Sequence, residues 1–271
     1  MGLVLFVDMD SFYASCEELR KPELKGKAFI VGTAEEGNRM KGVVETASYM
    51  AKRAGIRSAM PTAMAFKIKK DIVYVQADHE YYESISGKIM QKLKSFGFKM
   101  EMLSIDEAAL DLDGIDYKEA ERLGERMKGE INSGMGLPCT IGISDGKILA
   151  KMVCDDAKPD GLKVIKKEDI KEFLSNKDVQ KIWGVGRKTA ERLNGMGIRT
   201  IGDLAKTDPT VLGGAIGSFG AELYALANGR DDSKVVDQWK ILSISRDKGG
   251  TEGKGVFPGY VKITSSALLI L

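Results

Sequence analysis

Three carboxylates stand where apolar segments end or break, and carboxylates in such places can support metal-dependent chemistry. Asp8 follows the apolar run 2–7, and Asp106 and Glu107 interrupt the largely apolar segment 99–112. Carboxylates that converge from separate strands repel one another, and a hard divalent cation such as Mg²⁺ relieves that repulsion. Two such ions, about 3.5–4 Å apart, clamp the attacking and leaving oxygens of a phosphoryl displacement. The three residues therefore predict a magnesium site for phosphoryl transfer.

The neighbours Asp106 and Glu107 set a geometric condition on that site. Adjacent residues on a regular strand point to opposite faces of the sheet. A turn or a bulge is therefore needed to bring both carboxylates to one place. Spacing alone leaves another interpretation open, because carboxylates at strand ends are common in proteins that bind no metal.

Other kinds of catalytic site find little support in the sequence. The single histidine, His79, lacks the clustered partners of a metal site or a catalytic triad, and a surface or hinge position suits it better. The three cysteines, Cys16, Cys139 and Cys154, are widely spaced and odd in number, which argues against a disulfide framework and a zinc cluster. The chemistry must therefore rest on carboxylates, lysines, hydroxyl groups or a bound metal.

A second candidate site lies in a glycine-containing turn. Gly184 and Gly186 separate two short helical segments, with Arg187 and Lys188 directly after them. A helical hairpin of this kind exposes backbone N–H groups at a helix N-terminus. These groups bind the phosphates of a nucleic acid whatever its base sequence. Glycines also serve ordinary tight turns, so phosphate binding is the favoured interpretation and a plain turn is the alternative.

The apolar spacing predicts the elements that position these residues. Strands are expected at 2–8, 27–31, 138–143 and 162–165, with a broken strand pair over 99–112. Helices are expected at 11–19, 78–96, 117–132 and 147–157, and a loop at 32–42. Two helices packed on an antiparallel sheet, connected by a split βαβ plan, are the natural assembly. Beyond residue 165, short helices punctuated by glycines replace this pattern.

Composition and charge fit a protein that handles a polyanion. The 271 residues are 43% hydrophobic, enough for a sizeable core, and no apolar stretch is long enough to span a membrane. We therefore expect a cytoplasmic protein without membrane contact. Residues 11–76 carry 12 Lys and Arg against 7 Asp and Glu, whereas residues 1–10 and 77–166 together carry 13 against 19. An acidic centre flanked by basic segments suits metal-assisted work on a polyanion, although ordinary variation of surface charge explains it equally well.

Five motifs, in this order, resemble those of the DinB branch of the Y-family DNA polymerases. They are Val7-Asp-Met-Asp-Ser-Phe-Tyr-Ala14, Thr46-Ala-Ser-Tyr49, Gly55-Ile-Arg-Ser-Ala-Met-Pro61, Ser104-Ile-Asp-Glu-Ala108 and Ala157-Lys-Pro-Asp-Gly161. The resemblance extends from residue 3 to about residue 232. It implies a template-directed DNA polymerase that adds deoxynucleotides to a primer 3′-hydroxyl with two Mg²⁺ ions, and that is specialised for translesion synthesis with low fidelity.

The resemblance also implies an α+β fold with right-hand polymerase architecture. A ferredoxin-like palm would comprise residues 1–10 and 77–166, small α/β fingers residues 11–76, and an all-helical thumb with a helix-hairpin-helix residues 167–233. Residues 234–271 would be a linker and an atypical tail, where the family's C-terminal little-finger domain is missing or disrupted. The expected partners are primer-template DNA and deoxynucleoside triphosphates, and the expected state is a monomer. A sliding clamp is a further candidate partner, although no clamp-binding peptide is evident.

Site residues follow from the matched motifs. The resemblance implies that Asp8, Asp106 and Glu107 are catalytic and hold the two Mg²⁺ ions, assisted by the Met9 carbonyl. Asp10 is not counted among the metal ligands, and a structural role where palm and fingers join suits it at least as well. The residues implied to contact the nucleotide are Phe12, Tyr13, Thr46, Tyr49, Lys52 and Lys158, and those implied to contact DNA are Gly184, Gly186, Arg187 and Lys188.

Two of these residues carry a qualification. Tyr13 matches the steric gate, an aromatic ring packed where a ribose 2′-OH would otherwise sit, and plain core packing is the alternative. Lys52 stands where family members usually have arginine. Lysine can neutralise a phosphate but cannot make the planar two-pronged contact of arginine, so nucleotide affinity or base stacking is expected to differ.

Two rival functions remain open at this point. A nucleotidyl cyclase also places two carboxylates of a ferredoxin-like domain on two metals, but it has no use for a duplex-binding hairpin. A DNA-binding protein of the same fold, with weak or no activity, would follow if the last domain is indeed missing.

Overall fold

The computed structural model describes residues 2–35 and 38–237, and the expected tail lies outside this part of the chain except for residues 234–237. The strands are β1 (Leu3–Met9), β2 (Phe29–Glu35), β3 (Asn38–Ala47), β4 (Val73–Gln76), β5 (Met100–Met102), β6 (Glu107–Asp111), β7 (Cys139–Asp145) and β8 (Leu162–Val164). The helices are α1 (Phe12–Arg20), α2 (Tyr49–Arg53), α3 (Thr62–Ile68), α4 (His79–Lys94), α5 (Tyr117–Met135), α6 (Lys147–Ala157), α7 (Ile170–Ser175), α8 (Arg187–Gly195), α9 (Ile201–Lys206), α10 (Pro209–Ile216) and α11 (Phe219–Ala227), with short 3₁₀ turns η1 (Pro22–Leu24) and η2 (Val179–Lys181).

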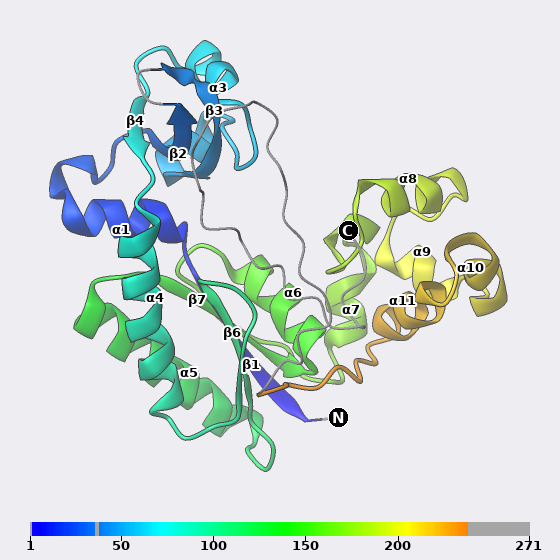
Figure 1. Cartoon of the computed structure of the whole chain (residues 1–271). Helices are drawn as coiled ribbons and strands as arrows, with labels where there is room; N and C mark the ends of the chain where they lie inside the picture. The colour runs from blue at the N-terminus through cyan, green and yellow to red at the C-terminus, as the bar shows by residue number, and fades with distance from the viewer. Residues whose placement is uncertain (1, 36–37, 238–271) are drawn as a thin grey trace.

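The larger sheet has the strand order β5-β6-β1-β7-β8, with β1 at its centre (Figure 1). β1 runs antiparallel to both β6 and β7, and only the edge strand β8 lies parallel to its neighbour. All seven residues of β1 are buried, which explains why its sequence is a continuous apolar run rather than an alternating one. The chain order β1-α4-β5-β6-α5-β7 is the predicted split βαβ plan. The expected ferredoxin-like sheet and α+β class are thus confirmed.

Helices cover both faces of this sheet. Leu3, Leu5 and Val7 face the core beneath α4 and α5, whereas Val4 and Phe6 point to the opposite face and pack against α6. Successive residues of a strand alternate between faces, so the two cores follow directly from the sequence of β1. Both faces of β1 are therefore covered, up to the strand end where Asp8 lies.

Gly142 allows α6 to approach the sheet closely, and replacing it with alanine is expected to destabilise the fold. A Cβ atom at this position would lie 2.2 Å from the Cys154 amide nitrogen and 2.3 Å from the Ala150 carbonyl oxygen. Because both are backbone atoms, β7 and α6 would have to separate, and overpacking of this kind costs about 1–3 kcal/mol. Thermal denaturation should show a lower Tm for Gly142→Ala. The control is Gly129→Ala on α5, where an added Cβ meets nothing within 4 Å and the Tm should not fall.

A smaller sheet forms a second body above the first in Figure 1, with the order β3-β2-β4. The expected loop at 32–42 is wrong, because this segment forms most of a hairpin in which Gly32 pairs with Val44 and Ala34 with Gly42. The outer residues of β3, such as Arg39 and Lys41, are exposed. They therefore lack the alternation of apolar and polar residues by which a strand is recognised in a sequence.

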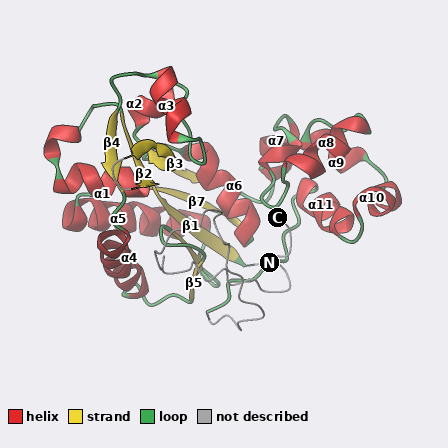
Figure 2. Ribbon diagram, turned by 45° about the horizontal axis from the view of Figure 1, so that its top comes forward, coloured by secondary structure: helices red, strands yellow, loops and turns green. Residues whose placement is uncertain are grey.

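Helices α7–α11 form a group beside α6 (Figure 2), and their hydrophobic core includes Leu149, Met152 and Val153 of α6. After α11 the chain returns to the larger sheet. The Asp231 carboxylate accepts hydrogen bonds from the amides of Ile148 (2.6 Å) and Leu149 (3.0 Å) and so caps α6, while the amide of Val236 donates to the buried Glu101 (2.8 Å). In residues 2–35 and 38–237, no helix is long and apolar enough to cross a bilayer.

Candidate active site

The three predicted carboxylates lie at one end of the central strand pair. Asp8 on β1 lies directly opposite Glu107 on β6 in the antiparallel register. Asp106 lies in the bend at 104–106 that precedes β6, and the amide of Met9 donates to its carbonyl oxygen (3.0 Å). The bend immediately before β6 is therefore the break in regular strand geometry that the adjacent carboxylates of Asp106 and Glu107 need in order to lie at one place.

Burial makes this end of the sheet unfavourable for negative charge. The pKa of Asp8 is raised by burial and by the neighbouring Glu107, against the opposing effect of Lys158. Burial also raises the pKa of Asp106, with the charge of Glu107 adding to it. These carboxylates consequently gain stability from any cation that comes close.

Two lysines supply positive charge at the carboxylates. The ammonium group of Lys158 lies 2.5 Å from Asp8 Oδ2, and that of Lys151 lies 2.5 Å from Glu107 Oε1. Burial alone would lower the pKa of both lysines, but the neighbouring carboxylates outweigh it and raise the pKa of each. The third carboxylate, Asp106, accepts a hydrogen bond from the Ser104 hydroxyl (2.6 Å).

The donor set of this site fits a hard divalent cation. Asp8, Asp106 and Glu107 offer only oxygen ligands, the kind that Mg²⁺ prefers, and burial raises the pKa of two of them. Within the described residues, no three Asp, Glu, His or Cys side chains are gathered closely enough to hold a metal ion as they stand. The structure thus brings Asp8 and Glu107 together with Asp106 beside them, each carboxylate held by a lysine or a serine.

Lys52 and Tyr49 of α2 approach the same end of the sheet from the smaller body. The Lys52 ammonium donates to the Ser11 hydroxyl (2.6 Å) and lies 5.0 Å from the centre of the Tyr49 ring. Burial and then the charge of Lys158 lower the pKa of Lys52. Two ammonium groups at this end of the sheet suit a polyanionic ligand such as a triphosphate.

Tyr13 and Phe12 differ in what they offer to a ligand. The Tyr13 ring stacks on Tyr82, with 4.3 Å between ring centres and 16° between planes, and meets the edge of His79 at 5.9 Å. It is only partly buried. Phe12, by contrast, is 3% exposed, so only its backbone at the start of α1 could meet a nucleotide.

Thr46, another residue predicted to contact the nucleotide, lies on β3. It is half-buried and pairs with Val31 of β2.

The predicted DNA-binding turn lies at the start of α8. Gly184 has φ +94°, a left-handed conformation that favours glycine, and Gly186 is the N-cap residue of α8. Arg187 and Lys188 follow in its exposed first turn. The preceding Trp183 lies near the carboxylates, because the Lys151 ammonium is 5.7 Å from the centre of its ring.

Comparisons with known proteins show which family the chain resembles. A family model described as the impB/mucB/samB family matches residues 7–155, and one described as the IMS family HHH motif matches residues 167–198. DNA polymerase IV of Methanoculleus marisnigri is 40% identical over 246 residues, which cover 90% of this chain and 68% of that protein.

Solved structures agree as well. A Y-family DNA polymerase chimera matches with a TM-score of 0.83 at 33% identity, over 88% of this chain and 70% of its own. DinB from Sulfolobus solfataricus matches with a TM-score of 0.80 at 33% identity, over 87% of this chain and 69% of its own. The chain belongs to the DinB branch of the Y-family DNA polymerases. The resemblance seen in the motifs is confirmed.

Some residues at the site of this Y-family chain escaped the sequence reasoning. Lys151 of α6 is one, although it lies two helical turns before Lys158, the residue that follows the last turn of the same helix. Thr140 and Asp155 also reach the site: the Thr140 hydroxyl donates to Asp10, and Asp155 forms an ion pair with Lys158. No pattern in the sequence marks Thr140 as a site residue, because the pairing of β1 with β7 is what brings it to Asp10.

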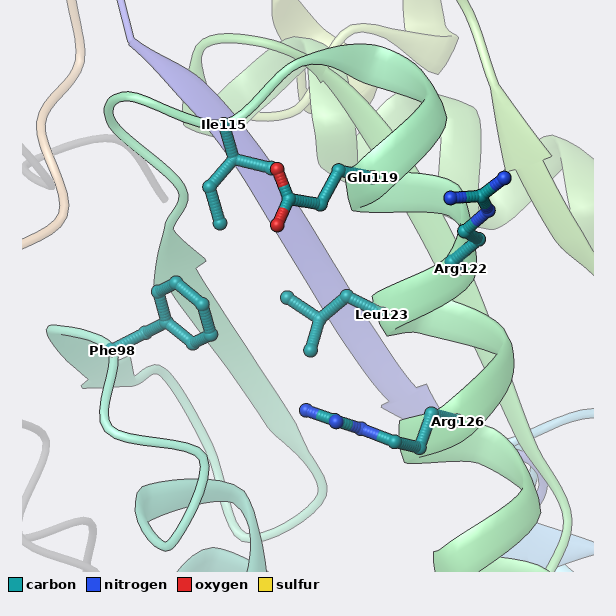
Figure 3. A pocket seen from close by; sticks show the side chains of 6 residues that line it. All are labelled: Phe98, Ile115, Glu119, Arg122, Leu123 and Arg126. Carbon is teal, nitrogen blue, oxygen red and sulfur yellow. The ribbon is translucent and has the colours of Figure 1, made fainter.

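A pocket elsewhere on the Y-family fold has no part in this site. It has a volume of about 280 Å³ and lies between α5, the segment that precedes β5 and the segment that follows β6 (Figure 3). Its lining contains none of the predicted site residues: it consists of Phe98, Ile115, Glu119, Arg122, Leu123 and Arg126.

Proposed function

We propose that this protein is a DNA-directed DNA polymerase that copies damaged template by adding deoxynucleotides to a primer 3′-hydroxyl. One observation carries the proposal for this chain: Asp8, Asp106 and Glu107 lie at one end of the sheet, where Lys158 contacts Asp8 and Lys52 contacts Ser11 in the segment after β1. Carboxylates for cations beside ammonium groups for phosphates are what nucleotidyl transfer requires. Membership of the Y family supports the same reaction, and the cytoplasm is the proposed location.

Each side chain has a role that its position supports. Asp8, Asp106, Glu107 and the Met9 carbonyl would hold two Mg²⁺ ions, which when bound lower the pKa of the primer hydroxyl and neutralise charge on the triphosphate. Lys158 and Lys52 would hold the phosphates, with Thr46, Tyr49 and the backbone at Phe12 beside them. Tyr13 would pack against the sugar, where its ring, backed by Tyr82, excludes a 2′-hydroxyl.

The division of the chain follows from these roles. We assign residues 1–10 and 77–166 to the palm, 11–76 to the fingers and 167–233 to the thumb. In the thumb, the backbone at Gly184 and Gly186 and the side chains of Arg187 and Lys188 would contact the phosphates of primer-template DNA. A sliding clamp and a monomeric state are further parts of the proposal.

A primer-extension assay with undamaged and damaged templates and Mg²⁺ tests this function. A polymerase elongates the primer on the undamaged template and inserts a nucleotide opposite a damaged base. A cyclase would consume nucleoside triphosphate without DNA, and a DNA-binding protein would retain the duplex on a gel without elongating it. Either of these two results in place of elongation would refute the proposal.

The thumb contact predicts a change in the salt dependence of DNA binding. Each phosphate contact adds about −0.9 to the slope of log K against log salt concentration. Arg187→Ala with Lys188→Ala should therefore make the slope shallower by about 1–2 units, measured by fluorescence anisotropy of labelled duplex at several salt concentrations. Lys118→Ala, an exposed lysine on α5, is the control and should leave the slope unchanged. An unchanged slope in the double variant would remove these residues from the DNA contact.

A further inference from the structure

Asp10 joins three segments that are far apart in the sequence. Its carboxylate is almost completely buried, with 1% of the residue exposed. It accepts hydrogen bonds from the Tyr49 hydroxyl of α2 (3.1 Å), the Thr140 hydroxyl of β7 (3.0 Å) and the Asp160 amide in the turn after α6 (2.8 Å). Asp10 thus contacts the fingers segment, the sheet and the turn that carries Lys158.

The backbone of Asp10 is fixed as firmly as its side chain. Its amide donates to the Pro138 carbonyl (3.1 Å), and its own carbonyl accepts from the Ser15 hydroxyl (2.6 Å). The Thr140 donor comes from a strand paired with β1, where Thr140 lies opposite Asp8. The carboxylate is therefore a fixed point of the larger sheet, to which Tyr49 and the Lys158 turn attach from either side.

Two of the attached groups belong to the proposed triphosphate site. Tyr49 adjoins Lys52 through its ring, and Lys158 lies two residues before Asp160, whose amide Asp10 holds. A phenol has a single proton to donate, and Tyr49 directs it to Asp10. This hydrogen bond fixes the orientation of the Tyr49 ring, and with it the place of the ring beside the Lys52 ammonium.

We propose that Asp10 is a positioning residue for the incoming nucleotide, holding Tyr49 of the fingers and the Lys158 turn of the palm at the spacing that the triphosphate requires. The inference rests on the proposed function. Asp10 itself need not touch the nucleotide or a metal, since the carboxylate is already occupied by three donors. A carboxylate that served only to stabilise the fold would affect folding but would have no energetic coupling to nucleotide binding through Tyr49.

The test compares nucleotide binding in Asp10→Asn, Tyr49→Phe and the double variant. Asparagine keeps the shape of the side chain but replaces one acceptor oxygen with a donor, so it cannot accept from all three donors, and at least one of these hydrogen bonds must be reversed or lost. We expect the Kd for a deoxynucleoside triphosphate to rise about tenfold or more, with a smaller change in the insertion rate at saturating nucleotide. Adding Tyr49→Phe should have less effect in Asp10→Asn than in the wild type, because both changes disrupt the same contact.

Calorimetric titration with the nucleotide gives the Kd, and single-turnover insertion on primer-template DNA gives the rate. Asp155→Asn is the matched control: Asp155 also holds Lys158, at 2.9 Å, but its side chain is 50% exposed. Its effect should be clearly smaller. Thermal denaturation checks that each variant is folded. If Asp10→Asn does not fold, Thr140→Val, which removes one donor and keeps the carboxylate, should weaken nucleotide binding in the same direction.

The outcomes separate this inference from the proposed function. Wild-type affinity in a folded Asp10→Asn or Thr140→Val variant, or effects that simply add to that of Tyr49→Phe, would overturn the positioning role while polymerase activity stands. A wild-type chain that binds the nucleotide but inserts none would refute the polymerase, and the Kd values would still decide the role of Asp10. A wild-type chain that binds no nucleotide would overturn both.

Discussion

Asp8→Ala and Asp106→Ala are each expected to abolish primer extension. Residues that only orient metal ligands typically contribute about 10–100-fold to metal affinity or activity, so loss of a ligand should reduce the extension rate by more than about 100-fold. The fold should persist, because Lys158 keeps its second partner Asp155 when Asp8 is removed. Within residues 2–35 and 38–237, the side-chain hydrogen bond of Asp106 is to its close neighbour Ser104. Extension is measured on a gel with Mg²⁺, and folding by thermal denaturation.

Asp111→Ala provides the control for these two variants. Asp111 lies on the same strand as Glu107, at the opposite end, where it pairs with Val4. Its loss should leave the extension rate close to that of the wild type. If Asp8→Ala or Asp106→Ala retained a tenth of wild-type activity, the metal assignment would be wrong and the carboxylates would be ordinary residues of a strand end.

Tyr13→Ala is expected to raise the incorporation of ribonucleotides relative to deoxyribonucleotides. The Tyr13 ring is held by stacking on the fully buried Tyr82, so it cannot easily move aside for a 2′-hydroxyl. A misfit of one methylene-sized group in a pocket is worth about 10–200-fold in discrimination, and the change should fall in or above that range. The ratio of kcat/KM for a deoxynucleotide and the matching ribonucleotide measures it.

Tyr13→Phe separates the ring from its hydroxyl. Because phenylalanine keeps the stacking surface, this variant should discriminate against ribonucleotides as well as the wild type does. A Tyr13→Ala variant that discriminates equally well would return Tyr13 to a role in core packing. Equal loss in both variants would mean that the hydroxyl, rather than the bulk of the ring, excludes the 2′-hydroxyl.

Local patterns in the sequence were sufficient for most of the larger sheet and the helices that cover it. The apolar run of β1 and the break at 104–107 predicted the central strands and the position of the carboxylates, because both depend on neighbouring residues only. The hairpin of β2 and β3 was missed, since its outer half is exposed and polar and is formed by pairing rather than by an apolar face.

The contacts around the carboxylates could not be predicted in the same way. Asp10 is separated by 130 residues from Thr140 and by 150 from Asp160. Such hydrogen bonds depend on the packing of α6 and β7 against β1, and no local pattern encodes them. The motifs therefore indicated which residues gather at the site, whereas their partners became visible only in the folded chain.

The template dependence of a single insertion tests most directly whether this protein is a template-directed DNA polymerase. Four primer-templates that differ only in the templating base are each incubated with the chain, Mg²⁺ and one deoxynucleoside triphosphate at a time. We predict that the complementary nucleotide is preferred on every template and that one pyrophosphate is released for each nucleotide added. Insertion of the same nucleotide whatever the template, or pyrophosphate release without DNA, would contradict template-directed polymerase activity.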